Sequence, residues 1–146
     1  MKNKRLATLA LGTALLTTGA QAQEHTPNIK DALVIVNSGS LQTQGMAMVL
    51  ASAMQAQGTS INILLCDKAG DLALQETQSA VLQPKGVTPE QLLAKLQQAG
   101  AKVDVCALYL PNSTHNKDQL RAGVGVAMPA DIAQQMTNIN TRVFNF

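Results

Sequence analysis

VDVCALYLPN, which runs from Val103 to Asn112, is a stretch of apolar and β-branched residues that predicts a buried β-strand. The strand is expected to stop at Pro111, because proline cannot donate a hydrogen bond to a sheet ladder. A second stretch, INILLC from Ile61 to Cys66, has the same character and ends on a cysteine. We therefore expect Cys66 at the end of its strand. Cys106 is expected deeper in the sheet, on the same face as the two leucines that follow it in the strand.

The elements before these strands complete a β-α-β unit. ALVIV, from Ala32 to Val36, predicts a strand that is buried on both faces. Residues 41–57 have helical spacing and end before Gly58, which is typical of a helix C-terminus. The apolar side chains of this helix that are expected to face the core are Met46, Val49, Leu50 and Ala53. A strand, a helix and a second strand in this order predict a right-handed crossover and a parallel sheet.

The second half of the chain alternates in the same way. Residues 67–87 are irregular, with room for a short helix only between residues 71 and 82. The TPEQ sequence that starts at Thr88 is a helix capping box, and Gly100 is expected to end that helix. The remaining expected elements are a short helix at 117–122, a strand at 123–127, a helix at 129–136 and a strand at 141–146. This alternation predicts an α/β fold, a three-layer α/β/α sandwich with a five-stranded, mainly parallel sheet.

The N-terminus has the composition of a secretory signal peptide. Three cationic residues lie among the first five, an apolar run follows over residues 6–16, and Ala20-Gln21-Ala22 offers small residues to a signal peptidase. The apolar run is too short to cross a bilayer as a helix. We expect cleavage after Ala22, a flexible lead-in over residues 23–30 and a single domain over residues 31–146. A buried N-terminal helix is the alternative.

Cleavage of this peptide changes the charge of the chain. The full sequence has a formal charge of +2, and the signal peptide removes three of the 11 Lys and Arg residues but no acidic residue, which leaves −1. With one Tyr and two Phe residues as well, the mature chain lacks the basic footprint and the stacking platform of a nucleic-acid-binding protein. Export of a bacterial-type precursor predicts a periplasmic protein without a membrane anchor. In that oxidising compartment, two cysteines form a disulfide by default.

Binding and catalytic residues are expected where the parallel strands end, because ligands of such sheets bind at the carboxyl edge. Three loops are expected at that edge, over residues 37–40, 66–70 and 109–115. Their candidate ligand-binding residues are Asn37, Ser38, Gly39, Asp67, Tyr109 and Asn112.

The sequence leaves three interpretations of the cysteines open. Cys106 can be a nucleophile, which requires a thiolate favoured by a nearby cation or helix N-terminus. It can also be a small buried hydrophobic side chain, or the partner of Cys66 in a disulfide. Cys66 is the less activated of the two, because a neighbouring carboxylate such as that of Asp67 raises the pKa of a thiol. The cations that could lie near Cys106 are Lys68, His115 and Lys117.

The sequence indicates no cofactor and no metal site. Neither histidine has a partner at a metal-ligand spacing, and the zinc-protease, CxxC, P-loop and nucleophile-elbow motifs are absent from the sequence. Methionine sulfur suits Cu(I), but Met46 and Met54 are expected on the core face of their helix, which favours packing over copper binding.

The mature chain resembles exported members of the DsrE/DsrF-like (YchN-like) family from about Asp31 to Phe146. The matching stretches are ALVIVNSG, QGMAM, ILLCDKAGDLAL, TPEQLLAKLQQAGAKVDVCALYLPN, LRAGVGVAMPADIAQQM and TRVFNF. The resemblance implies a five-stranded parallel sheet between helices and assembly into oligomers, homo-oligomers here. In cytoplasmic relatives, a cysteine persulfide carries sulfur within a protein relay. The acceptor cysteine of those relatives belongs to the strand and loop region in which Cys106 lies.

Two functions of different classes follow from these observations. The first is a periplasmic sulfur-carrier or thiol-redox protein, with Cys106 as the sulfur acceptor and Cys66 as its resolving or disulfide partner. Such a protein is at most a sulfur-transfer enzyme, and its partner is a sulfur donor or acceptor protein. The second is a non-catalytic oligomeric module that binds a small ligand and whose cysteines are structural.

Overall fold

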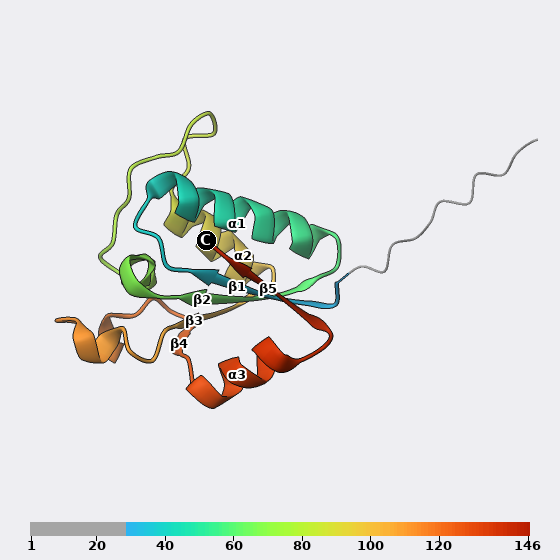
Figure 1. Cartoon of the computed structure of the whole chain (residues 1–146). Helices are drawn as coiled ribbons and strands as arrows, with labels where there is room; N and C mark the ends of the chain where they lie inside the picture. Colours follow the sequence, from blue (N-terminus) through green and yellow to red (C-terminus); the bar gives the residue numbers. More distant parts are fainter. Residues whose placement is uncertain (1–28) are drawn as a thin grey trace, which may run out of the picture.

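A five-stranded parallel sheet forms the centre of the computed structural model, which describes residues 29–146 (Figure 1). The strand order is β4-β3-β2-β1-β5, and every neighbouring pair is parallel. The strands are β1 (Asp31–Val36), β2 (Ser60–Leu65), β3 (Lys102–Val105), β4 (Val124–Val126) and β5 (Thr141–Asn145). The predicted parallel sheet is therefore confirmed, with β2 and β3 as neighbours.

Helices cover both faces of the sheet. The helices α1 (Leu41–Ala56) and α2 (Pro89–Gln98) lie together on one face, and α3 (Pro129–Thr137) lies on the other (Figure 1). The structure therefore confirms the α/β class and is consistent with the three-layer sandwich. No helix of residues 29–146 is both long and apolar enough to span a membrane.

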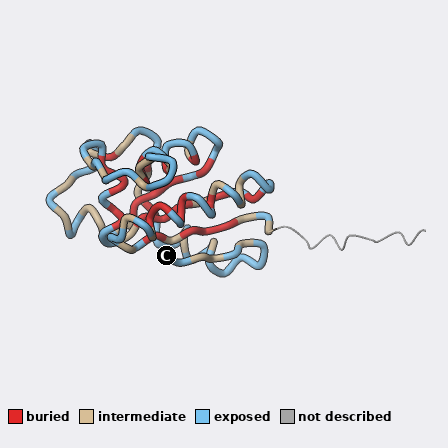
Figure 2. Tube along the Cα trace, turned by 90° about the horizontal axis from the view of Figure 1, so that it is seen from above, coloured by how far each residue is buried: buried red, intermediate tan, exposed pale blue. Residues whose placement is uncertain are grey.

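The core is larger on the side of α1 and α2. Side chains that alternate along the strands, such as Val34, Ile63 and Val103, point into a large apolar cluster between the sheet and these two helices. The opposite face carries a small cluster built on Leu33, Leu64 and Ala127. Figure 2 shows the buried residues concentrated in the central strands, and the α-helices that contribute buried residues are α1 and α2.

The start of α2 forms as the sequence predicts. Thr88 is the N-cap, and its hydroxyl accepts a hydrogen bond from the Gln91 backbone N–H at 3.3 Å. The Gln91 side chain accepts a hydrogen bond from the Thr88 N–H at 3.0 Å, which completes the capping box. The chain leaves the helix through Gly100, whose φ of +97° lies in the left-handed region that glycine adopts without strain.

The predicted core face of α1 is wrong except at Met54, which packs partly buried against the larger core. Met46, Val49 and Leu50 are 54%, 48% and 43% exposed, and Ala53 is also exposed. The helix instead buries a different face, on which Gly45, Ala47 and Ala51 are small and Gln44 and Met48 are large. Small side chains let the helix approach its neighbours closely. A Cβ atom at Gly45 would lie 2.2 Å from Cδ1 of Leu82 in the segment that follows η1.

The third strand is shorter than predicted. β3 ends at Val105, residues 107–109 form a turn, and Leu110–Asn112 forms the 3₁₀ helix η2. The neighbouring strand β2 ends at Leu65, and the bond from the Cys106 N–H to the Leu65 carbonyl, at 2.8 Å, follows their last register pair. Cys106 therefore lies at the edge of the sheet and not deeper within it. Of the two leucines predicted on its face, Leu108 is 69% exposed and Leu110 is partly buried against the larger core.

The segment after β2 also differs from its prediction. Residues 71–82 contain no α-helix; the 3₁₀ helix η1 (Asp67–Ala73) comes directly after Cys66. The Arg121 guanidinium fastens the segment by donating to the carbonyls of Leu72 and Thr77 at 3.0 and 2.7 Å. The helix predicted at 117–122 is a single 3₁₀ turn, η3 (Lys117–Gln119). The predicted signal peptide and residues 23–28 of the lead-in lie outside the described residues.

Candidate functional site

The two cysteines meet at the carboxyl edge of the sheet. Each cysteine is the first residue after its strand. Leu65, the last residue of β2, pairs with Val105, the last residue of β3, so Cys66 and Cys106 lie side by side. Both are partly buried against the small apolar cluster on the α3 face, and the Cys66 thiol hydrogen-bonds to Cys106. Both are free thiols in the structure. The Cys66–Cys106 disulfide stays a prediction for the oxidised protein.

Cys66 holds its proton firmly. Its pKa is raised from 9.0 to about 12, first because burial disfavours the thiolate, then because of the hydrogen bond and charge of Cys106 and the charge of Asp67. Asp67 has a φ of +46°, a left-handed conformation that is uncommon outside glycine. At neutral pH Cys66 is therefore a hydrogen-bond donor and a poor nucleophile, which leaves Cys106 as the candidate nucleophile of the pair.

The raised pKa of Cys66 makes stability depend on pH in the alkaline range. A folded-state pKa above the unfolded value contributes stability that is complete below pH 9 and is lost as the pH rises toward 12. We expect the free energy of unfolding to fall more steeply over this range in the wild-type protein than in Cys66→Ser. Urea denaturation at a series of pH values measures the slope, and equal slopes would contradict the raised pKa. Tyr109 also has a raised pKa, but it contributes equally to both proteins.

A cleft of about 570 Å³ opens beside Cys106. It lies between η1, which begins at Asp67, and the loop that follows β3. The residues that line it are Asp67, Lys68, Asp71, Cys106, Leu108, Tyr109, Asn112, Ser113, Thr114 and His115. Most of them are charged or can form hydrogen bonds, so the cleft fits a small polar ligand with access to the Cys106 sulfur.

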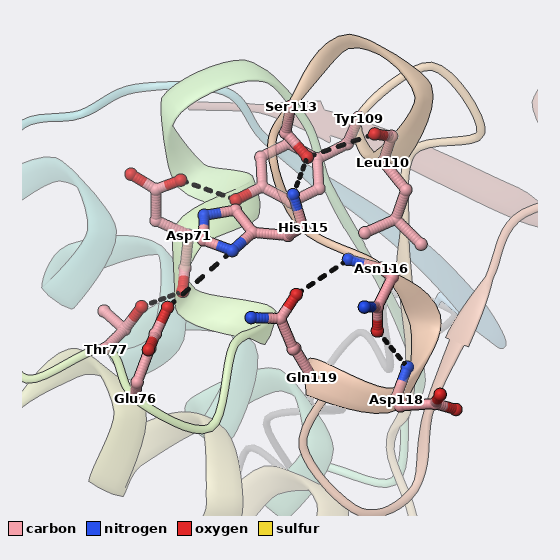
Figure 3. A network of polar contacts seen from close by, with 10 residues as sticks. All are labelled: Asp71, Glu76, Thr77, Tyr109, Leu110, Ser113, His115, Asn116, Asp118 and Gln119. Atoms are coloured by element: carbon pink, nitrogen blue, oxygen red, sulfur yellow. Dashed lines mark hydrogen bonds and ion pairs between the residues drawn. The ribbon is translucent and has the colours of Figure 1, made fainter.

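Tyr109 joins the two walls of this cleft. Its hydroxyl donates to Oδ1 of Asp71 at 2.6 Å (Figure 3). Its pKa is raised above the ordinary range, first by burial and then by the hydrogen bond and charge of Asp71. The ring packs directly on the backbone of Gly70, where a Cβ atom would lie 2.3 Å from Cδ2 of Tyr109. The glycine therefore makes room for the tyrosine that ties η1 to the loop.

His115 also lines the cleft and lies beside Tyr109 (Figure 3). Its Nδ1 lies 3.7 Å from Oε1 of Glu76 and is buried without a hydrogen bond. Its backbone N–H donates to the Ser113 hydroxyl at 3.2 Å, which holds the loop in place. Of the three predicted cations, His115 and Lys68 line the cleft, and Lys117 does not.

A second, apolar cavity of about 300 Å³ lies on the other side of Cys106. It is lined by Leu64, Leu108 and Ala127 and by α3 residues that include Ile132 and Met136. Cys106 and Leu108 line both cavities. The sulfur of Cys106 is therefore placed between a polar cleft and an apolar one.

The structure brings together only some of the predicted binding residues. Asp67, Tyr109 and Asn112 line the polar cleft with Cys106. Gly39 lines a smaller cavity, which Lys68 also lines. Asn37 and Ser38 line neither of the two cavities beside Cys106. The Asn37 side-chain amide instead donates to Oδ1 of Asn145 in β5, and the Ser38 hydroxyl accepts from the Ser40 N–H, so both side chains hold the loop in place.

Asp71 is the site residue that the sequence did not reveal. Its position depends on η1, and a 3₁₀ helix leaves little periodic signal in a sequence. The glycine before it was the available signal, because Gly70 provides the space for Tyr109. Among residues 29–146, no three His, Cys, Asp or Glu side chains gather as metal ligands would.

Comparisons with known proteins support the fold. No model of a protein family matches the chain, and no curated protein matches it. Among solved structures, the chain is similar to the crystal structure of the ychN protein from E. coli, with a TM-score of 0.65 and 18% identity. The match covers 80% of this chain and 99% of that one. At this identity the likeness establishes a YchN-like, DsrE/DsrF-like fold.

Proposed function

We propose that the chain is an exported member of the DsrE/DsrF-like family that carries sulfane sulfur as a persulfide on Cys106. The observation that carries the proposal is the placement of Cys106 at a strand end, where it lines two cavities beside a second thiol. The YchN-like fold supports the family. The signal-like residues 1–22 support a periplasmic location.

The transfer step requires no oxidant. The Cys106 thiol loses its proton to solvent, and the thiolate attacks the outer sulfur of a donor persulfide, R–S–SH. A new S–S bond joins Cys106 to that sulfur, the S–S bond of the donor breaks, and its electron pair leaves on R–S⁻. The proton stays on the transferred sulfur. The same exchange in reverse delivers the sulfur to an acceptor thiolate.

Cys66 has a protective role in this proposal. If Cys66 were a thiolate, it could attack the Cys106 sulfur, form a disulfide and release hydrosulfide, and the carried sulfur would be lost. Because its pKa is raised to about 12, the thiol stays protonated at neutral pH and does not attack readily. As a protonated neighbour, it also donates a hydrogen bond to Cys106. Attack of Cys66 on the Cys106 persulfide is then slow at neutral pH and becomes faster as the pH rises.

We also propose that the protein works as a homo-oligomer. The support is the row of exposed apolar side chains on α1, Met46, Val49 and Leu50, which a monomer would leave in water. Sulfur donor or acceptor proteins are the further partners that a carrier requires.

Intact-mass spectrometry of the folded protein without its signal peptide tests the carrier function. After treatment with inorganic polysulfide and removal of the excess, we expect a gain of one sulfur atom per chain that dithiothreitol reverses. A protein that gains no sulfur, with both thiols unreactive until it is denatured, would instead fit the non-catalytic binding module. A mass two hydrogens lower, unchanged by polysulfide, would indicate the structural disulfide.

A further inference from the structure

Asp67 and Lys68 bring opposite charges to the same wall of the cleft, next to each other in η1. Within residues 29–146 the ion pairs are Lys102–Asp104 and His115–Glu76, so neither Asp67 nor Lys68 has an ion-pair partner. Asp67 moreover holds an uncommon positive φ, as residues at ligand sites often do. A carboxylate and an ammonium group in the same cleft complement a ligand that carries both charges.

We propose that the polar cleft binds a small zwitterionic aminothiol of the α-amino-acid type, whose persulfide is the sulfur donor for Cys106. The ligand ammonium lies at Asp67, its carboxylate at Lys68, and its sulfur at Cys106. This inference rests on the proposed carrier function for the transfer step but not for the binding step.

The charges of the cleft favour this class over a dianion such as thiosulfate. The cleft holds two carboxylates, Asp67 and Asp71, one ammonium group, Lys68, and the imidazole of His115, whose Nδ1 lies 3.7 Å from Oε1 of Glu76. Asp71 is engaged by the hydroxyl of Tyr109, which leaves Asp67 to receive a cation. A doubly negative donor would place its second charge near carboxylates, where like charges repel. A zwitterion instead meets one opposite charge at each end.

The remaining lining fits the rest of such a ligand. On the loop after β3, the Asn112 amide and the Ser113 hydroxyl already donate to backbone carbonyls. The Asn112 amide oxygen and the Thr114 hydroxyl are left for the ligand, and Leu108 provides an apolar contact for the methylene group. Because Cys106 lines the same cleft, the bound persulfide presents its outer sulfur to the Cys106 thiolate. Attack forms the S–S bond to Cys106, breaks the S–S bond of the ligand, and releases the aminothiol as its thiolate.

Calorimetric titration with S-methyl-L-cysteine tests the binding step, because this thioether keeps both charges but cannot transfer sulfur. Two analogues separate the charges. N-acetyl-S-methyl-L-cysteine lacks the ammonium, and 2-(methylthio)ethylamine lacks the carboxylate. We expect S-methyl-L-cysteine to bind at least about tenfold more tightly than either analogue, because the loss of one charged hydrogen bond typically costs that much affinity.

Two variants assign the charges. Lys68→Gln should weaken the binding of S-methyl-L-cysteine about tenfold and leave the binding of 2-(methylthio)ethylamine unchanged. Asp67→Asn should also weaken the binding of S-methyl-L-cysteine about tenfold, but it should leave the binding of the N-acetyl analogue unchanged. Lys117→Gln and Asp118→Asn, which remove the same charges from η3 outside the cleft, are the matched controls and should change nothing.

The outcomes separate this inference from the carrier function. Equal binding of all three ligands, or binding of none, overturns the inference even if polysulfide loads Cys106. Tight binding of the N-acetyl analogue alone also overturns it and points to a cysteine within a peptide. Selective binding of S-methyl-L-cysteine by a protein that polysulfide does not load upholds the site and overturns the carrier function.

Discussion

Replacing Cys106 with serine is expected to abolish sulfur loading, from one sulfur per chain in the wild-type protein to background. Serine keeps nearly the same shape, so the edge of the sheet should be preserved, but a hydroxyl does not form a persulfide. Cys66 should not substitute for it, because its raised pKa keeps it protonated. Intact mass after polysulfide treatment gives the stoichiometry, and urea denaturation confirms that the variant is folded.

Cys66→Ser is the matched control for this variant. It removes the neighbouring thiol but leaves Cys106, so it should still gain one sulfur. Its persulfide should also survive alkaline incubation longer than that of the wild-type protein, because no second thiol remains to displace hydrosulfide. Sulfur loading of Cys106→Ser, together with loss of loading in Cys66→Ser, would reassign the acceptor to Cys66.

Gly70→Ala is expected to have the largest effect on stability of any single methyl addition at the site. The new Cβ would lie 2.3 to 2.8 Å from ring atoms of Tyr109, so the ring must move, and its 2.6 Å hydrogen bond to Asp71 is lost with it. Such overpacking typically costs about 1–3 kcal/mol. Urea denaturation measures the free energy of unfolding, and ligand titration reports the damage to the cleft.

Removing the ring shows whether the clash is the cause. In Tyr109→Ala, the space above Gly70 is empty, so adding Gly70→Ala to that variant should cost much less than it does in the wild-type protein. This double-mutant cycle should give a coupling energy of about 1 kcal/mol or more. If Gly70→Ala costs the same in both backgrounds, the close approach of Tyr109 is not what the glycine accommodates.

The features that local chemistry determines could be predicted from the sequence. Buried strands are visible as runs of β-branched residues, and the capping box at Thr88 is a local pattern of hydrogen bonds. The convergence of Cys66 and Asp67 with the loop after β3 followed from a rule of parallel sheets, because carboxyl ends share one edge.

The features that depend on contacts with other helices and strands could not be predicted from the sequence. The buried face of α1 is set by how closely small residues such as Gly45 let other segments approach, whereas its pattern of large side chains indicated a different face. The end of β3 is set by the end of β2, which the sequence of β3 does not contain. For the same reason, the sequence could identify Lys68 as a cation but could not place it in the cleft that Cys106 lines.

The side-by-side strand ends also determine where the sequence can change length. Because side chains alternate along a strand, one residue inserted within β2 or β3 would turn the cysteine that follows it toward the α1 and α2 side of the sheet and separate the two sulfurs. The segment between Leu74 and Val87 has no such register with the sheet, and a longer loop there adds little closure entropy. Length variation among relatives that keep both thiols should therefore concentrate in that segment and be absent from Ser60–Cys66 and Lys102–Cys106.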